Sequence, residues 1–157
     1  MIDKIIVTTD FSECGNSALK FACGLGKQMG AKVAVLTIIE REKHESAYFI
    51  DYKPLESKEN ADKARRQAKD RMKKLLTDDL TQGADVTTEA RIARTAVEGI
   101  VNTVDREKPD LLVMSTHGIS GFRAFLLGST FEKVLRSVTC PVLSVREECL
   151  VDGEPVS

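Results

Sequence analysis

The sequence predicts an α/β domain built on an open parallel sheet, and three observations support this fold class. Short β-branched runs alternate with longer stretches of helical period along the chain. The run 33–39 reads Val-Ala-Val-Leu-Thr-Ile-Ile without polar alternation, which is typical of a strand buried on both faces. No segment repeats at the spacing of a solenoid. Strands that alternate with helices in this way form one sheet with helices packed on it.

Each expected element follows from a local pattern. The predicted strands are 4–8, 33–39, 86–91, 111–114 and 142–145, and the predicted helices cover 12–30, 60–76, 95–108 and 129–137. Asp10 and Ser12 can cap the first helix, and Gly30 ends it. Thr95 and Glu98 have the spacing of a capping box at the start of the third helix. Strand, helix and strand in succession imply parallel crossovers.

Two segments lack any hydrophobic period. Residues 40–59 are charged and contain Pro54, and we interpret them as a long surface connection. Residues 147–157 are predicted to form an irregular C-terminal tail. The sequence therefore predicts one domain over 1–146, which is long enough to bury a core without a disulfide or a metal.

Composition excludes several classes of function. A formal net charge of −1 with 30% charged residues gives no basic surface for nucleic acid or for anionic lipid. No apolar run approaches the length of a membrane span, and the first residues enter a strand without a signal-peptide pattern, so we expect a cytoplasmic protein. The four cysteines show neither a CxxC pair nor histidines at ligand spacing, which favours reduced thiols over a zinc site or a disulfide framework.

The stretch 113–130 carries the most specific motif. An apolar strand leads into a loop with Gly118, and nine residues later Gly128-Ser129-Thr130 opens a helix. Backbone N–H groups of such a loop, together with the start of a helix, form an anion site. The stretch resembles the nucleotide signature of the universal stress protein family, Gly-x-x-Gly followed by nine residues and Gly-Ser or Gly-Thr. The resemblance extends from residues 7–13 to 140–145, and Ser115 stands at the signature's first Gly.

This resemblance implies an open, doubly wound, five-stranded parallel sheet of order 3-2-1-4-5. The resemblance also implies that the fold is Rossmann-like, a three-layer sandwich of the adenine nucleotide alpha hydrolase type. In such sheets ligands bind at the carboxyl ends of the strands, where the strand order reverses. Strands one and four meet there, so Thr9, Asp10 and the loop from Ser115 to Gly128 are expected to converge on one crevice.

The resemblance also implies the ligand, ATP or the related AMP or ADP, with Mg²⁺ accompanying the phosphates. Backbone near Thr8, Thr9 and Ile38 would hold adenine, Asp10 the ribose, and the glycine loop the phosphates. No catalytic residue and no metal-binding side chain is predicted. The candidate ATP-binding residues are Thr8, Thr9, Asp10, Ile38, Met114, Ser115, His117, Gly118, Gly128, Ser129 and Thr130.

Several of these residues can also be explained by a purely structural role, without a ligand. Asp10 can simply cap the first helix, Met114 can be a buried strand residue, and His117 can be a structural loop residue without a nucleophile to activate. The glycines can form a plain turn. Gly24-x-Gly26 imitates a dinucleotide fingerprint, but it lies inside a helical stripe and is interpreted as close helix packing.

The chain also departs from the family pattern where arginines are common. Ile119 and Ala124 stand at these positions, so phosphate charge would be met by backbone dipoles, Arg123 or Arg94. The predicted function is an ATP-binding, stress-response regulatory protein that is not an enzyme. A nucleotide-free dimeric interaction module and a slow ATPase are the alternatives.

A homodimer is expected through strand five, because its apolar edge 142–145 would otherwise need the tail from residue 147 to cover it, which would leave a monomer. On this account Leu143→Pro removes a ladder donor and weakens association more than folding.

Overall fold

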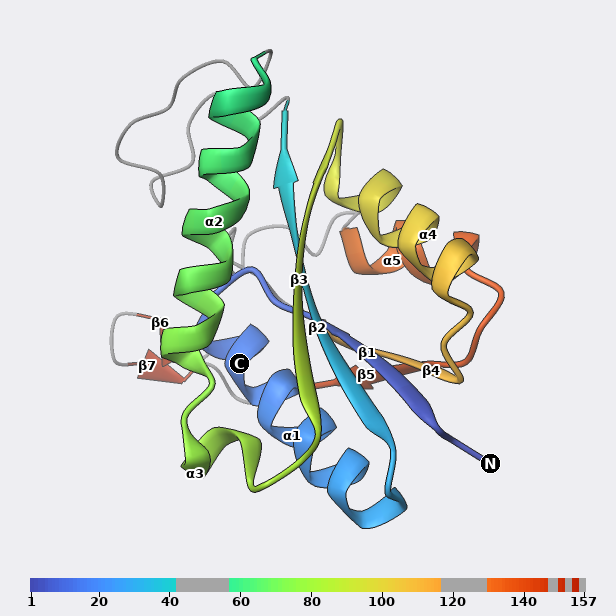
Figure 1. The fold of residues 1–157 in the computed structure, drawn as a ribbon. Coiled ribbons are helices and arrows are strands. Elements are labelled where there is room, and N and C mark those ends of the chain that lie inside the picture. The colour runs from blue at the N-terminus through green and yellow to red at the C-terminus, as the bar shows by residue number, and fades with distance from the viewer. Residues whose placement is uncertain (42–56, 117–129, 147–149, 152–153, 156–157) are drawn as a thin grey trace.

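A computed structural model of the chain describes residues 1–41, 57–116, 130–146, 150–151 and 154–155. Figure 1 shows a central twisted sheet with helices packed on both of its faces. The first five strands and the helices, in chain order, are β1 (Lys4–Thr8), α1 (Glu13–Met29), β2 (Lys32–Glu40), α2 (Lys58–Leu75), α3 (Asp78–Thr81), β3 (Val86–Ala93), α4 (Ala96–Glu107), β4 (Leu111–Ser115), α5 (Thr130–Ser137) and β5 (Val142–Val145).

The five strands form one parallel sheet in the order β3-β2-β1-β4-β5, which confirms the predicted fold class and strand order. β1 lies at the centre, with Val7 opposite Val35 of β2 and opposite Val113 of β4. The strand order reverses between β1 and β4, which are neighbours in the sheet but far apart in the sequence.

Side chains that alternate along the strands fill two separate cores. Ile5 and Val7 of β1 point to one face and pack with residues of α1 and α2, including Leu19 and Met72. On the opposite face, Ile6 packs with Leu36, Leu112 and Met114 of the sheet and with Ile100, Val104 and Val134 of α4 and α5. The sheet is therefore the middle layer of three, as Figure 1 shows.

The predicted helix ends are largely confirmed. The Ser12 hydroxyl accepts a hydrogen bond from the Gly15 N–H at the start of α1, and Gly30 ends the helix with a φ of 68°. Thr95 caps α4 by accepting from the Glu98 N–H at 3.2 Å. The Glu98 side chain pairs with Arg94, however, and the Ala96 N–H donates to Glu40 Oε1 at 2.6 Å.

Close helix packing is confirmed at Gly26 and not at Gly24. A Cβ atom at Gly26 would lie 2.4 Å from Val33 Cγ2, whereas at Gly24 it would meet only Gln82 at an ordinary 3.6 Å. The glycine lets α1 approach β2, and an alanine there would cost about 1–3 kcal/mol by overpacking.

Some details differ from the sequence prediction. The short helix α3 lies between α2 and β3, where no period was visible. In the tail that the sequence predicts as irregular, β6 (Leu150–Val151) and β7 (Glu154–Pro155) pair antiparallel. Elements this short are fixed by local pairing, and two residues cannot display a hydrophobic period.

The prediction of reduced cysteines is confirmed in part. Cys23 and Cys140 are free, and burial raises the pKa of the Cys23 thiol to about 11. Burial also raises the pKa of Cys140. The prediction is wrong for Cys14, which is disulfide-bonded. The two free thiols are therefore predominantly protonated at neutral pH and poor nucleophiles.

Candidate functional site

The register of the sheet brings the ends of three strands to one edge. β1 and β4 run in parallel with Val7 opposite Val113, so the residues that follow each strand emerge side by side. The Thr9 N–H donates to the Leu36 carbonyl at 2.9 Å, which extends the pairing of β1 and β2 past Thr8. Thr9, the last residues of β2 and Ser115 consequently lie around the point where the strand order reverses.

The connection from β1 to α1 is organised by a short chain of hydrogen bonds. The Gly15 N–H donates to Ser12 Oγ at 3.0 Å, and the Ser12 hydroxyl donates to Asp10 Oδ1. The Ser12 N–H donates to the same Asp10 oxygen at 3.0 Å. Ser12 is thus the direct cap of α1, and Asp10 stabilises the cap. The capping role and the ribose-binding role expected for Asp10 are therefore compatible, because its carboxylate supports the cap and also lies at the end of β1.

Gly15 approaches the Asp10 carboxylate closely. A Cβ atom at Gly15 would lie 2.9 Å from Asp10 Oδ1 and 3.3 Å from Ser12 Oγ. The glycine therefore gives the carboxylate room beside the first turn of α1, near the positive end of the helix dipole.

The candidate residues on the strands have distinct surroundings. Thr9 is buried, and its Oγ1 accepts from the Phe11 N–H at 3.0 Å. Thr8 is half-buried at the end of β1. The Ile38 side chain packs on α4, because a Cβ at Gly99 would lie 2.7 Å from its Cδ1. Met114 is only 4% exposed within the second core, as expected of a buried strand residue.

The structure describes the two margins of the glycine loop. Ser115 is the half-buried last residue of β4, and the Thr116 N–H donates to the Val145 carbonyl at 3.3 Å. Thr130 is the exposed first residue of α5. His117, Gly118, Gly128 and Ser129 lie outside the described residues, as do Ile119, Arg123 and Ala124.

Two contacts near this edge were not predicted. Glu40, at the end of β2, accepts from the first N–H of α4 across 56 positions of sequence. Phe11 has a φ of 65°, in the left-handed region, and the Arg71 guanidinium lies 4.1 Å from the centre of its ring. Neither contact has a local sequence signal, because each joins elements that only the fold brings together.

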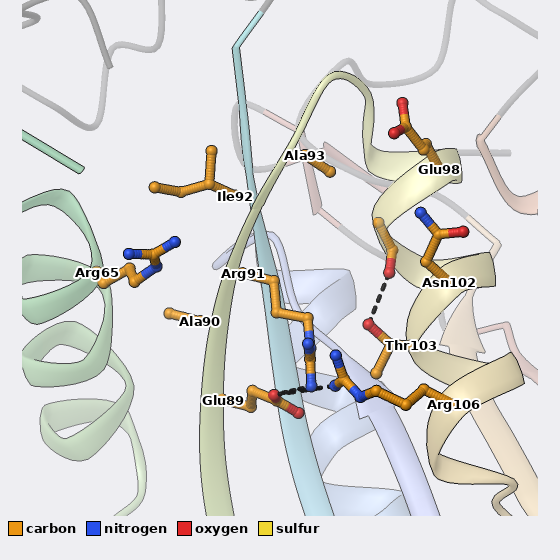
Figure 2. A pocket seen from close by; sticks show the side chains of 11 residues that line it. Arg65, Glu89, Ala90, Arg91, Ile92, Ala93, Glu98, Asn102, Thr103 and Arg106 are labelled. Atoms are coloured by element: carbon orange, nitrogen blue, oxygen red, sulfur yellow. Dashed lines mark hydrogen bonds and ion pairs between the residues drawn. The ribbon is translucent and has the colours of Figure 1, made fainter. Parts of the chain in front are cut away.

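A cavity of about 340 Å³ lies elsewhere, between the edge strand β3 and α4. Figure 2 shows Arg91 and Arg106 directed toward Glu89. Burial raises the pKa of Glu89 in spite of Arg106, whereas hydrogen bonds from Lys4 and Arg106 lower that of Glu107. Arg91 and Arg106 also pair with Glu107. The charged side chains at the centre of this cavity are thus paired with one another.

In the described part of the chain, no group of three or more His, Cys, Asp and Glu side chains is arranged to hold a metal ion. No described helix is long and apolar enough to cross a membrane.

Comparison with known proteins agrees with this architecture. The sequence model of the Universal stress protein family matches residues 1–146. Universal stress protein YxiE of Bacillus subtilis is 30% identical over 152 residues, covering 93% of this chain and 100% of YxiE. The structure of MJ0577 from Methanocaldococcus jannaschii superposes with a TM-score of 0.76 at 27% identity, covering 96% of this chain and 99% of that one.

A universal stress protein solved in complex with cAMP is also similar. Its identity to this chain is 26% and its TM-score 0.61, with 92% of this chain and 97% of that chain covered. The family match covers nearly the whole sequence, and the strand order agrees with it. The chain belongs to the universal stress protein family.

Proposed function

We propose that this protein binds an adenine nucleotide, with ATP as the principal ligand, in the crevice at the carboxyl ends of β1 and β4. The observation that supports the proposal most is the convergence of Asp10 and Ser115 at adjoining strand ends where the strand order reverses. The cAMP complex of a relative with 26% identity supports an adenine nucleotide in a fold of this kind.

In this proposal each part of the nucleotide meets a different group of residues. Backbone near Thr8, Thr9 and Ile38 holds the adenine, and the Asp10 carboxylate accepts hydrogen bonds from the ribose hydroxyls. The phosphates lie against Gly118, Gly128, Ser129 and Thr130, where backbone N–H groups and the start of α5 favour negative charge. Met114, Ser115 and His117 complete the margin of the crevice, and Mg²⁺ accompanies the phosphates.

Titration calorimetry with Gly128→Val tests the phosphate position. A branched side chain would occupy the place of the phosphates, so Gly128→Val is expected to abolish ATP binding without unfolding the domain. Gly24→Val is the matched control, because a Cβ there meets only the Gln82 side chain at 3.6 Å or more. Equal affinity of the wild type and Gly128→Val for ATP would remove the assignment.

A nucleotide-free interaction module is the second candidate, and Ser115 favours it. Its half-buried side chain stands where the family signature has Gly, and it would crowd a ribose or phosphate. Mass spectrometry of the purified protein separates the two candidates, because only the nucleotide-binding protein is expected to carry over an adenine nucleotide.

We propose regulation as the purpose of binding, in a cytoplasmic stress response. Ligand binding would act by changing the surface that the loop 115–128 presents. Adenine nucleotides should bind better than guanine nucleotides, and hydrolysis should be slow, because no placed general base is assigned. Turnover near the enzyme median of about 10 s⁻¹ would instead support the ATPase alternative.

We also propose a homodimer through β5. Among the described strands, β5 has β4 as its single neighbour. The Pro141 carbonyl accepts from Leu112 of β4 and the Val145 carbonyl from Thr116, which follows β4, so the alternation of the strand directs the N–H of Leu143 toward β4 as well. The prediction that a proline at Leu143 would probe the free edge is therefore wrong, and Ser144, whose N–H points outward, is the correct position.

Ser144→Pro removes an outward donor, whereas Ser144→Ala keeps it and serves as the control. Sedimentation at micromolar concentration should show a dimer for the wild type and Ser144→Ala and a monomer for Ser144→Pro. A wild-type mass of 17.3 kDa at that concentration would refute the dimer.

A further inference from the structure

We infer that Arg71 of α2 is a positioning residue for the nucleotide site, and that it acts by holding the ring of Phe11 beside Asp10. The inference rests on the proposed role of Asp10 in binding ribose.

Three residues other than glycine have positive φ in the described part of the chain. Gln82 and Lys108 are the residues that end α3 and α4, where the left-handed conformation is common. Phe11 ends no helix. A bulky side chain at a φ of 65° is a true outlier, of a kind that costs free energy and persists only where the surroundings fix it.

The surroundings of Phe11 fix it from three sides. Its N–H donates to Thr9 Oγ1 at 3.0 Å. The next N–H, that of Ser12, donates to Asp10 Oδ1 at 3.0 Å. The ring packs against the core shared by α1 and α2, and the Arg71 guanidinium lies 4.1 Å from the ring centre. The ring is therefore held between an apolar core and a cation.

The consequence of this conformation falls on Asp10. The reversal at Phe11 brings the Ser12 N–H and hydroxyl back to Asp10 Oδ1, and these bonds orient the carboxylate at the end of β1. If the ring leaves its place, Phe11 relaxes to an ordinary backbone conformation and this reversal opens. Arg71 thus acts on the carboxylate through the ring and the backbone, without needing to contact a nucleotide itself.

Ribose selectivity provides a measurement that general stability does not change. The wild type should bind ATP more tightly than 2′,3′-dideoxy-ATP, which lacks the hydroxyls that Asp10 would hold. In Arg71→Ala this preference should fall about threefold, the factor that a half-buried cation–π contact is worth. Arg71→Lys keeps a cation over the ring and should restore most of the preference, and Arg66→Ala, an exposed arginine of the same helix, should leave it unchanged.

Amide hydrogen exchange tests the same contact without a nucleotide. Exchange of the Phe11 and Ser12 N–H groups should accelerate about threefold in Arg71→Ala relative to Arg66→Ala. Unchanged exchange and an unchanged preference in Arg71→Ala would overturn the inference. If the wild type shows no preference for ATP over the dideoxy form, the ribose role of Asp10 fails and with it the functional part of the inference, whereas the exchange rates still decide the contact between Arg71 and Phe11.

Discussion

The two ends of the strand pair β1 and β4 use an aspartate in opposite ways. At the amino end, Asp110 precedes β4 and its Oδ2 accepts the N–H groups of Asp3 and Lys4, both at 2.9 Å. At the carboxyl end, Asp10 follows β1 and accepts from Ser12 in its own loop. The first carboxylate joins two neighbouring strands that are far apart in the sequence, while the second organises a turn beside the proposed crevice.

The amino end is further tied by Lys4. Its Nζ donates to Glu107 Oε2 at 2.7 Å and to the Glu107 carbonyl at 3.1 Å, so the last turn of α4 is fastened to the start of β1. These contacts cross more than 100 positions of sequence. We therefore expect stability to depend on the amino end of the sheet and ligand binding on the carboxyl end, although both ends use the same carboxylate chemistry.

Substitution at the carboxyl end should have the largest effect. In Asp10→Asn the amide oxygen still accepts from the Ser12 N–H, so the loop is kept while the charge that would bind ribose is lost. ATP affinity is expected to fall about tenfold, as is typical for a hydrogen bond to a charged group. Calorimetry on Asp10→Asn and Asp110→Asn decides this prediction, and an equal loss in both variants would contradict the division between the two ends.

Substitution at the amino end should lower stability and leave ATP binding unchanged. Asp110→Ala removes the acceptor of two backbone N–H groups at an exposed position, and with it the link between the start of β1 and the start of β4. The midpoint of thermal unfolding is expected to fall by about 2–4 °C, the shift that corresponds to roughly one net hydrogen bond in a domain of this size. A weaker ATP affinity in Asp110→Ala would show that the two ends are coupled.

Sequence reasoning predicted local helix caps better than contacts between elements that are distant in the sequence. Ser12, Gly30 and Thr95 act within a few residues of where they stand, so their caps are visible in the sequence. The contacts of Asp110 and Glu40 were missed because each joins elements that are distant in sequence and adjacent only in the folded sheet. The strand order came from the family resemblance, since hydrophobic period alone does not order strands.

The left-handed Phe11 was missed for a different reason. Asp-Phe-Ser has no glycine or asparagine to signal a positive φ, and the conformation depends on a ring contact from α2, 60 positions away. Local side-chain patterns therefore did not predict what holds Phe11 in this conformation.

The smallest expected effect is the pH dependence of stability, and its sign distinguishes the groups at the amino end. Two backbone hydrogen bonds, from Asp3 and Lys4, lower the pKa of Asp110 below its ordinary value, so its contribution is complete above about pH 4 and is lost as the pH falls through the lowered pKa. Glu107 contributes in the same direction, because the hydrogen bond from Lys4 lowers its pKa. Glu89 contributes oppositely. Burial raises its pKa, so its contribution to stability is lost as the pH rises through the raised pKa.

Unfolding followed from about pH 6 to about pH 3 should therefore show the stability difference between the wild type and Asp110→Asn shrinking in acid. Over the same pH range, the stability of the wild type should instead rise relative to that of Glu89→Gln as the pH falls. A difference for Asp110→Asn that stays constant down to the lowest pH would mean that its carboxylate does not carry this linkage, and that the amino end is held by packing instead.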